Sequence, residues 1–221
     1  MKSATIAKKF YKELGVSKFK EVANEYHVDD DIVFLKRQCR KKDIILDLAC
    51  GYGRVTLPLA KGGYHITGID ISKDLILDAR RNAKLLGLHI NFDIGDMMKL
   101  PYVNKSFDKV FCMWNSFNSL LTKKDQLTAL NEAYRVLKPG GRMFVVLING
   151  EEEGLKRELR ENGVGKEKRI WNGLLKGVTF SMYIHNRVSI KDLCVKSAFK
   201  GCKISLRKMN NTKRIVVLLA R

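Results

Sequence analysis

A bend that contains two glycines is the first feature of this sequence that could do chemistry. Gly51 and Gly53 follow an apolar run, in the stretch ILDLACGYGR at residues 45–54. Glycine permits positive φ and lets a backbone approach a bound molecule without a Cβ in the way. Three interpretations compete: a loop for a dinucleotide, a loop for another nucleoside, and a tight turn that binds nothing.

An acidic residue at a defined distance favours a nucleoside over an empty turn. Asp70 ends the next apolar run, nineteen positions after Gly51. An acid at the end of the second strand of such a unit is placed to accept hydrogen bonds from both ribose hydroxyls. The glycine bend and Asp70 are independent features, and together they predict a bound nucleoside.

Two residues around the bend argue against a dinucleotide. A dinucleotide-binding loop needs a third glycine three positions after Gly53, where helix and strand pack closely behind the pyrophosphate, and here the residue is Thr56. Asp47, inside the strand, would repel a diphosphate but can hold an ammonium group through water or backbone. The pattern therefore favours an amino-acid nucleoside such as S-adenosylmethionine.

The surrounding sequence predicts the elements that would position this loop. Short apolar or β-branched runs lie at 43–49, 64–70, 89–95, 107–114 and 141–148. Helical periodicity lies between them at 72–87, capped by Ser72 and stopped by Gly87, and again after Thr122 until KPGG at 138–141. Strand and helix alternation of this kind predicts a parallel sheet, with ligands beyond the carboxyl ends of its strands.

Several ordered motifs resemble those of a known family, the class I S-adenosylmethionine-dependent methyltransferases, especially the small type 11 or type 25 kind. LDLACGYGR at 46–54 is similar to its first motif, D-x-G-x-G-x-G, with Ala49 in place of the first glycine. The likeness continues through GIDIS at 68–72, GDMMKLP at 95–101, SFDKVFCMWNSF at 106–117 and RVLKPGGRMFV at 135–145. It extends more faintly to 187–204 and 213–220, which look like the closing helix and last two strands.

The resemblance implies a set of site residues. Those for S-adenosylmethionine are Asp47, Ala49, Gly51, Gly53, Arg54, Asp70 (ribose), Ile71, Asp96 (adenine amino group), Met97 and Cys112, the last with Met113 near the methionine end. Trp114, Asn115 and Phe117 follow the fourth strand, where aromatic faces could bind an acceptor, and Tyr11 is a further candidate. No metal ligand set and no dedicated catalytic side chain are expected.

The resemblance also implies a fold: an α/β, doubly wound, Rossmann-like sheet of seven mostly parallel strands, with helices on both faces and the last strand antiparallel. We expect a single domain over 1–221. Residues 1–42 would form a helical lid of two helices, with Tyr11 and Tyr26 as contacts. Residues 43–150 would form the cofactor-binding core, and 151–221 a substrate-side insertion followed by closing strands. The stretch 151–183, which holds Trp171, is the expected cap.

The expected chemistry needs little from side chains. A sulfonium methyl group is already activated, so the protein has to align the acceptor and exclude water. A base is needed only if the acceptor must lose a proton. Tyr11, His27 and His185 are the candidates, and spacing alone places none of them in the site.

Charge leaves two classes of acceptor open. The net charge is +19, and residues 151–221 hold 17 of the 42 Lys and Arg residues but only 7 of the 23 acids. A small molecule is the expected acceptor for so compact a chain, and RNA such as tRNA is the alternative, because basic faces attract phosphate. Against RNA, MWNSF at 113–117 lacks the Asn-Pro-Pro-Tyr type signature of many base methylases. A non-catalytic S-adenosylmethionine-binding protein and an NAD-dependent oxidoreductase are weaker alternatives.

Composition indicates the compartment. Five cysteines with no Cys-x-x-Cys pair favour neither a disulfide framework nor a zinc site. The opening MKSATIAKKF reaches lysines before any apolar stretch could serve as a signal peptide, and the run at 215–220 is too short to span a bilayer. We therefore expect a cytoplasmic protein without a membrane partner.

Overall fold

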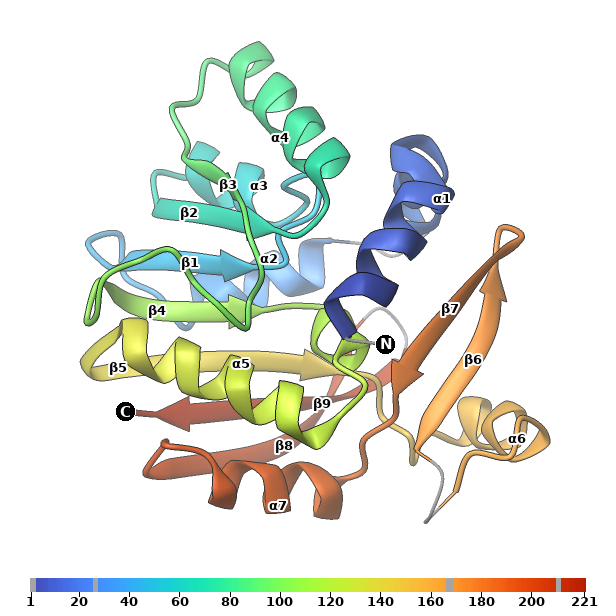
Figure 1. Ribbon diagram of the computed structural model, residues 1–221. Helices are drawn as coiled ribbons and strands as arrows, with labels where there is room; N and C mark the ends of the chain where they lie inside the picture. Colours follow the sequence, from blue (N-terminus) through green and yellow to red (C-terminus); the bar gives the residue numbers. More distant parts are fainter. Residues whose placement is uncertain (1–2, 26–27, 166–168, 210–211) are drawn as a thin grey trace.

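A twisted central sheet organises the molecule (Figure 1). The computed structural model describes residues 3–221 except 26–27, 166–168 and 210–211. Within these residues the sheet has seven strands in the order β3-β2-β1-β4-β5-β9-β8. The strands are β1 (Ile44–Leu48), β2 (His65–Asp70), β3 (Phe92–Ile94), β4 (Phe107–Cys112), β5 (Leu137–Leu147), β8 (Gly201–Met209) and β9 (Thr212–Ala220). β9 runs antiparallel to both of its neighbours, and the pairs formed among β1 to β5 are parallel, which confirms the predicted sheet.

Helices cover both faces of the sheet, as predicted. They are α2 (Asp29–Lys36), α3 (Thr56–Lys61) and α4 (Lys73–Leu85) on one face, and α5 (Lys123–Val136) and α7 (Arg187–Lys196) on the other. Both expected caps form: the hydroxyl oxygens of Ser72 and Thr122 accept hydrogen bonds from the backbone N–H groups of Leu75 and Asp125. Because both faces are covered, strands such as β1 are apolar almost throughout.

α5 ends at Val136, just before KPGG, as predicted, but strand β5 takes the place of the predicted turn. β5 begins at Leu137, directly after α5, and KPGG lies within its bounds. Phe107 pairs with Leu137 and Lys109 pairs with Arg142, so residues 138–141 bulge between these two pairings. Gly140 has a φ of 74°, which a residue with a side chain adopts poorly.

Two segments stand beyond the carboxyl ends of the parallel strands (Figure 1). One is α1 (Ser3–Asn24), broken at Gly15, where φ is 73°. The other is an insertion after β5, built from α6 (Glu153–Glu161) and a hairpin of β6 (Ile170–Leu175) and β7 (Val178–Tyr183). α2 does not join them. Its apolar residues pack on the sheet, so the prediction that both N-terminal helices cover the site is wrong for α2.

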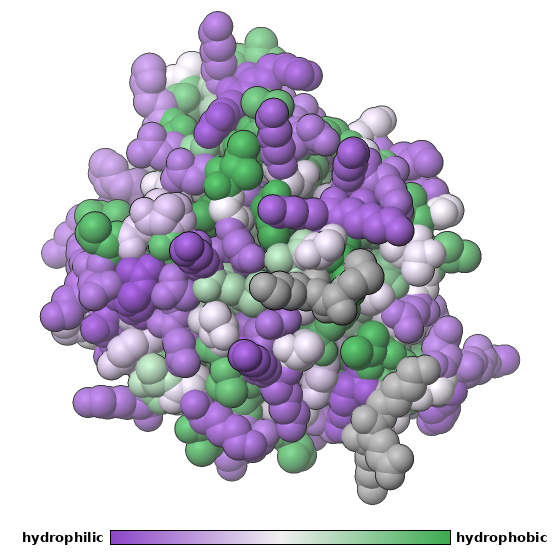
Figure 2. All heavy atoms as spheres, viewed as in Figure 1, coloured by the Kyte–Doolittle hydropathy of each residue, from purple (hydrophilic) through white to green (hydrophobic). Residues whose placement is uncertain are grey.

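Figure 2 shows one face on which hydrophilic side chains predominate and hydrophobic ones are scattered among them. No helix in the described part of the chain combines the length and apolarity needed to cross a membrane.

Candidate functional site

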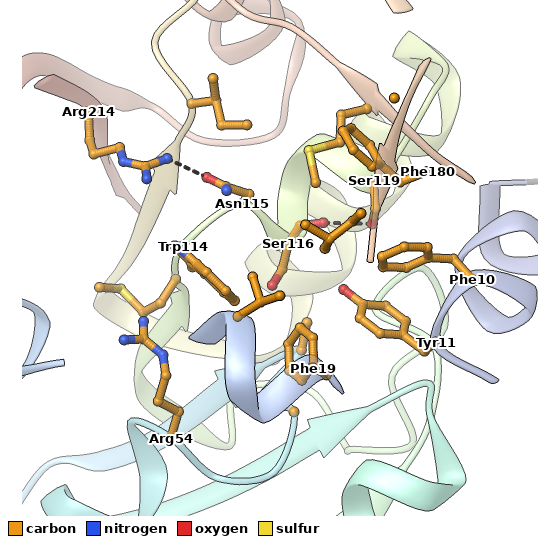
Figure 3. Close-up of a pocket in the computed structure, with 18 of the residues that line it drawn as sticks. Phe10, Tyr11, Phe19, Arg54, Trp114, Asn115, Ser116, Ser119, Phe180 and Arg214 are labelled. Atoms are coloured by element: carbon orange, nitrogen blue, oxygen red, sulfur yellow. Dashed lines mark hydrogen bonds between the residues drawn. The ribbon is translucent and has the colours of Figure 1, made fainter. Parts of the chain in front are cut away.

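A cavity of about 650 Å³ opens at the carboxyl ends of the strands. It lies against the loop after β1, the residues after β4, α1, the insertion and the start of β9. Figure 3 shows side chains from these segments converging on it. The cavity is therefore formed jointly by all three parts of the chain that the sequence distinguished.

The loop after β1 is fixed to the end of β2 through Asp70. Gly51 N donates to Asp70 Oδ2 at 2.9 Å, and Ser72 N donates to Oδ1 at 2.8 Å. Asp70 is 5% exposed, and burial raises the pKa of its carboxyl group against these backbone hydrogen bonds. Each oxygen keeps a further lone pair, and Asp70 lines the cavity. The geometry therefore permits two more hydrogen bonds from a ligand.

Asp47 also lines the cavity, from inside β1. Its Oδ2 accepts a 2.6 Å hydrogen bond from Thr56 Oγ1. Burial raises the pKa of Asp47 to about 7, against the lowering effects of Thr56 and Arg54. Thr56, which the sequence marks only as a missing glycine, thus holds the acid that faces the ligand space.

The glycine motif contributes unequally to the site. Ala49 and Gly51 line the cavity with φ of 57° and 58°, so Ala49 is held in a conformation that favours glycine. Gly53 does not line it, contrary to the expectation of cofactor contact. A Cβ there would lie 3.0 Å from the side chain of Leu57 and 3.2 Å from that of Phe92, so Gly53 is needed for packing.

A buried ion pair adjoins the loop. Arg54 Nη2 binds Asp31 Oδ2 of α2, and the two side chains are 10% and 3% exposed. Arg54 Nη1 is also buried, and it has no hydrogen-bond partner among the described residues. The guanidinium lies 5.1 Å from the ring of Trp114. Arg54 therefore keeps one N–H edge for a ligand, and Asp31 is a site residue that the sequence did not reveal.

A second, smaller cavity of about 30 Å³ continues past Asp70. Ile71, Asp96 and Met97 line it, as the resemblance implies, and residues of α1 close it. Asp96 Oδ1 accepts a hydrogen bond from Met98 N at 2.9 Å. Tyr11 lines both cavities, and its hydroxyl group points toward Ser116 in Figure 3.

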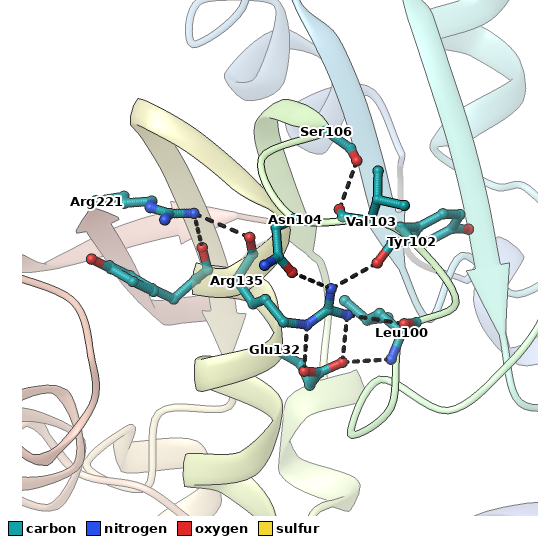
Figure 4. Close-up of polar contacts among 9 residues, drawn as sticks. Leu100, Tyr102, Val103, Asn104, Ser106, Glu132, Arg135 and Arg221 are labelled. Carbon is teal, nitrogen blue, oxygen red and sulfur yellow. Dashed lines mark hydrogen bonds and ion pairs between the residues drawn. The ribbon is translucent and has the colours of Figure 1, made fainter.

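Arg135 of α5 holds the segment that follows Asp96 (Figure 4). Its guanidinium donates to the backbone oxygens of Leu100 and Tyr102 and to the side chain of Asn104, at 2.7 to 3.0 Å. Glu132 pairs with the same guanidinium and accepts a hydrogen bond from Leu100 N. This network fixes the segment from Leu100 to Asn104 against α5.

The segment after β4 only partly matches the expectation. Met113, Trp114 and Asn115 line the larger cavity, and Trp114 has a φ of 59°, a strained value for a bulky residue. Cys112 and Phe117 line neither cavity, although Cys112 was expected near the methionine end only through its backbone atoms, and this expectation stays a prediction. Both side chains are fully buried in the core, so the structure corrects the placement of the Phe117 ring at the acceptor site.

The base candidates fare differently. His185 is 1% exposed, lies outside both cavities, and has a pKa that burial lowers to about 3. Burial raises the pKa of Tyr11 well above its usual value, so its hydroxyl group stays protonated. Tyr26 and His27 lie outside the described residues. No histidine is found among the described residues that line the larger cavity.

Side chains from distant segments complete the lining, and no sequence motif marked them. Arg214, at the start of β9, is 8% exposed and donates to Asn115 Oδ1 at 2.7 Å. Phe10 and Phe19 come from α1, and Phe180 joins the predicted Trp171 in the hairpin. The aromatic residues spaced along the hairpin could have indicated Phe180. No pattern in the neighbouring sequence indicates Arg214.

The fold and this site define a Rossmann-like, nucleoside-binding class of protein. Residues 45–141 match a protein family described as a methyltransferase domain. The demethylmenaquinone methyltransferase of Streptomyces avermitilis is 32% identical over 141 residues, 58% of this chain and 58% of that protein. The ubiquinone biosynthesis O-methyltransferase of Coxiella burnetii is 31% identical over 142 residues, 64% of this chain and 57% of that protein. Over residues 45–141 the chain therefore matches a methyltransferase domain of the class I, S-adenosylmethionine-dependent kind.

Solved structures agree on the fold. Magnesium protoporphyrin IX methyltransferase from Synechocystis, with bound SAH, matches 98% of this chain and 99% of its own with a TM-score of 0.73 at 16% identity. A SAM-dependent methyltransferase from Methanosarcina mazei matches 85% of this chain and 95% of its own, with a TM-score of 0.71 at 23% identity. The chain spans about half the length of the curated relatives it matches.

Proposed function

We propose that this chain binds S-adenosylmethionine along the loop after β1 and transfers its methyl group to a small-molecule acceptor. The observation that carries the proposal is Asp70, whose two oxygens are held by the N–H groups of Gly51 and Ser72 and still face the cavity. An acid fixed in this way suits the two hydroxyl groups of a ribose.

The remaining polar groups fit the amino-acid end of the same molecule. Asp47 offers an acid to an ammonium group, and Arg54 Nη1 offers a buried N–H without a partner among the described residues to a carboxylate. Asp96 and Met97 border the smaller cavity, where an adenine amino group would find an acceptor. The residues present therefore fit the whole of S-adenosylmethionine.

The protein's part in the reaction is alignment. S-adenosylmethionine supplies a methyl group already activated on a sulfonium. Trp114 and Asn115 border the transfer end, and α1 with the hairpin covers it from water. The Tyr11 hydroxyl group is placed to donate a hydrogen bond rather than to remove a proton.

The names of the relatives support a small acceptor. They describe methyltransferases of menaquinone and ubiquinone biosynthesis, and a structural neighbour is named for magnesium protoporphyrin IX. The enclosing lid and hairpin also suit a small molecule better than a polymer.

Thermal unfolding with ligands tests the proposal. We expect S-adenosylhomocysteine at one hundred times its Kd to stabilise the protein by about 2.7 kcal/mol, and NAD at the same concentration to leave it unchanged. Asp70→Asn should weaken this binding at least about tenfold, or about 1.4 kcal/mol, because its amide N–H₂ cannot accept from Gly51 N. The exposed Asp74→Asn is the matched control. Stabilisation by NAD alone would contradict the proposal.

A further inference from the structure

Two cysteine side chains meet where α7 and β8 pack together. Figure 1 shows α7 beside β8, and residues 197–200 join the two elements. Cys194 lies in the last turn of α7 and is 1% exposed, within the core between the helix and the sheet. Cys202 is the second residue of β8 and is exposed. One member of the pair is therefore shielded from solvent, while the other is open to it.

The alternation of side chains along β8 turns Cys202 toward α7. Ile204, two residues further along the strand, packs against the core cluster that contains Cys194. Side chains two positions apart in a strand point to the same face of the sheet. Arg207, an odd number of positions away, points to the other face, where its guanidinium lies over the Phe34 ring. Strand geometry thus places both thiols on the same face of the sheet.

The two thiols are hydrogen-bonded to each other. This bond, together with burial, raises the pKa of Cys194. The same bond, together with the ammonium group of Lys191 one turn earlier in α7, lowers the pKa of Cys202. Cys194 therefore donates the proton, and Cys202 has the greater thiolate character. Because a thiolate is the species that attacks a disulfide, Cys202 is the nucleophile of the pair and Cys194 is a second thiol within its reach.

The remaining cysteines differ from this pair. Cys50 and Cys112 are buried and Cys39 is half-buried, so Cys202 is the one exposed cysteine among the five, all of which lie in the described residues. Burial raises the pKa of Cys50 and Cys112 and raises that of Cys39 to about 12. A dissolved oxidant would therefore react first at Cys202.

We propose that Cys194 and Cys202 are a thiol-oxidation site, which a small-molecule disulfide converts into a reversible disulfide bond between α7 and β8. The Cys202 sulfur attacks one sulfur of the reagent, forms a mixed disulfide and releases the other half of the reagent. The Cys194 sulfur then attacks the Cys202 sulfur and releases the second half. Each departing half keeps the electron pair of the broken S–S bond and takes one proton. Two protein thiols are thus oxidised, and one reagent disulfide is reduced to two thiols.

The bond would act on the edge of the sheet. β8 is the outermost strand of the described sheet, and it pairs with β9 from Gly201 opposite Ala220 to Met209 opposite Thr212. Tying the start of β8 to α7 should slow the opening of this edge. Neither cysteine lines the larger or the smaller cavity, so ligand binding there should be unaffected. The inference is therefore independent of the proposed methyl transfer.

Incubation of the full chain with excess glutathione disulfide, followed by capping of free thiols and peptide mass spectrometry, tests the proposal. Trypsin cuts after Lys196 and Lys200, so the two cysteines fall on separate peptides that only a disulfide bond joins. We expect this joined pair, the loss of two of the five free thiols, and the recovery of both with dithiothreitol. Cys194→Ser should instead keep a glutathione adduct on Cys202, because the second thiol is missing. Cys202→Ser should keep its other thiols free, and Cys39→Ser, the matched control, should form the bond.

Hydrogen exchange gives a second readout. Amide groups at the start of β8 should exchange several-fold more slowly in the oxidised protein than in the reduced protein, and the affinity for S-adenosylhomocysteine should be the same in both. Unchanged thiols, a lasting glutathione adduct on Cys202 of the unmodified protein, or a bond to another cysteine would overturn the inference. Equal exchange in the two forms would overturn the effect assigned to the bond. Failure of the reduced protein to bind S-adenosylhomocysteine would bear on the proposed function alone.

Discussion

At the scale of single residues, the protonation state of Asp47 should affect both the stability of the fold and the binding of a charged ligand. It lies fully buried on β1, bonded to Thr56, and burial raises the pKa of its carboxyl group to about 7. The folded protein therefore holds a proton there more tightly than the unfolded chain does. A bound ammonium group would favour the ionised form, so ligand binding and deprotonation of Asp47 should be coupled.

This coupling predicts a pH dependence of stability. Because the pKa of Asp47 is higher in the folded state, the free energy of unfolding of the ligand-free protein should fall as pH rises from about 4 to 7, by up to about 1.4 kcal/mol per pH unit. Asp47→Asn removes the titrating group and should flatten that part of the curve. Urea unfolding at pH 5, 6, 7 and 8 measures both. Identical slopes for the two proteins would show that Asp47 does not titrate in this range.

Which site residues the sequence could reveal depends on how they reach the site. Asp47, Gly51 and Asp70 occupy fixed offsets along one strand–loop–strand unit, so local spacing was enough to place them. Arg214 and Asp31 reach it through tertiary packing, and no local pattern marks a residue that contributes in this way. The sequence placed Phe117 in the site because it lies near Trp114 along the chain. A short helical turn at Ser116–Ser119 instead directs its ring into the core.

At the scale of elements, α1 is a cover made of two helical parts. Gly15 breaks it into two parts, and the part before the break closes the smaller cavity. The part after the break is tied to α4 by an ion pair between Lys20 and Asp78 at 2.5 Å. The smaller cavity of about 30 Å³ leaves little room for an adenine ring, so we expect the first part of α1 to shift when a nucleoside enters.

Ser3 fastens the N-terminal end of α1 to α5 and the loop before it. Its hydroxyl group donates to Asp125 Oδ2 at 2.6 Å and accepts from Leu121 N at 2.9 Å, and the residue is 1% exposed. We expect Ser3→Ala to loosen the cover, because two hydrogen bonds worth about 1 kcal/mol each are lost. S-adenosylhomocysteine should then associate several-fold faster, and proteases should cut before Gly15 more readily.

Stopped-flow binding and limited proteolysis measure the two effects. Ser17→Ala, on the exposed face of the same helix after the break, is the matched control and should behave like the unmodified protein. If Ser3→Ala and Ser17→Ala associate with the ligand at equal rates, Ser3 does not fasten the cover.

The sequence predicted the core elements well and the covering elements less well. Periodicity and caps defined β1 to β5, α4 and α5, because each is amphipathic or buried in a regular pattern, but the short α3 was not predicted. The break at Gly15 and the hairpin of the insertion depend on contacts between distant segments, such as Lys176 with Glu21 at 2.8 Å. Local patterns carry no information about such contacts.

At the scale of the whole molecule, the surface charge and the shape of the cavity favour different kinds of ligand. The net charge of +19 attracts any polyanion, and exposed basic residues such as Lys203, Arg207 and Lys208 line the edge strand β8. The cavity, in contrast, is bounded by a lid and a hairpin and suits a small molecule. We interpret the basic surface as a source of general attraction that is separate from acceptor choice.

A comparison of polyanions tests that separation. We expect tRNA to bind at 20 mM salt, to lose most of its affinity by 200 mM, and to receive no methyl group. Heparin, which has charge but no bases, should bind in the same way. Gel retardation and transfer of labelled methyl measure the two properties. Binding that prefers tRNA over heparin, together with label on the tRNA, would make RNA the acceptor.

The direction of β9 has a consequence for how this fold can diversify. A strand that runs against its neighbours begins where they finish, so its first residues, Arg214 among them, are delivered to the rim on which the ligand loops converge. Residues from both outer parts of the chain thereby meet residues of the middle part around the larger cavity. We therefore expect that substitutions in α1, the hairpin or the start of β9 can change which acceptor is bound without altering Gly51, Gly53 or Asp70.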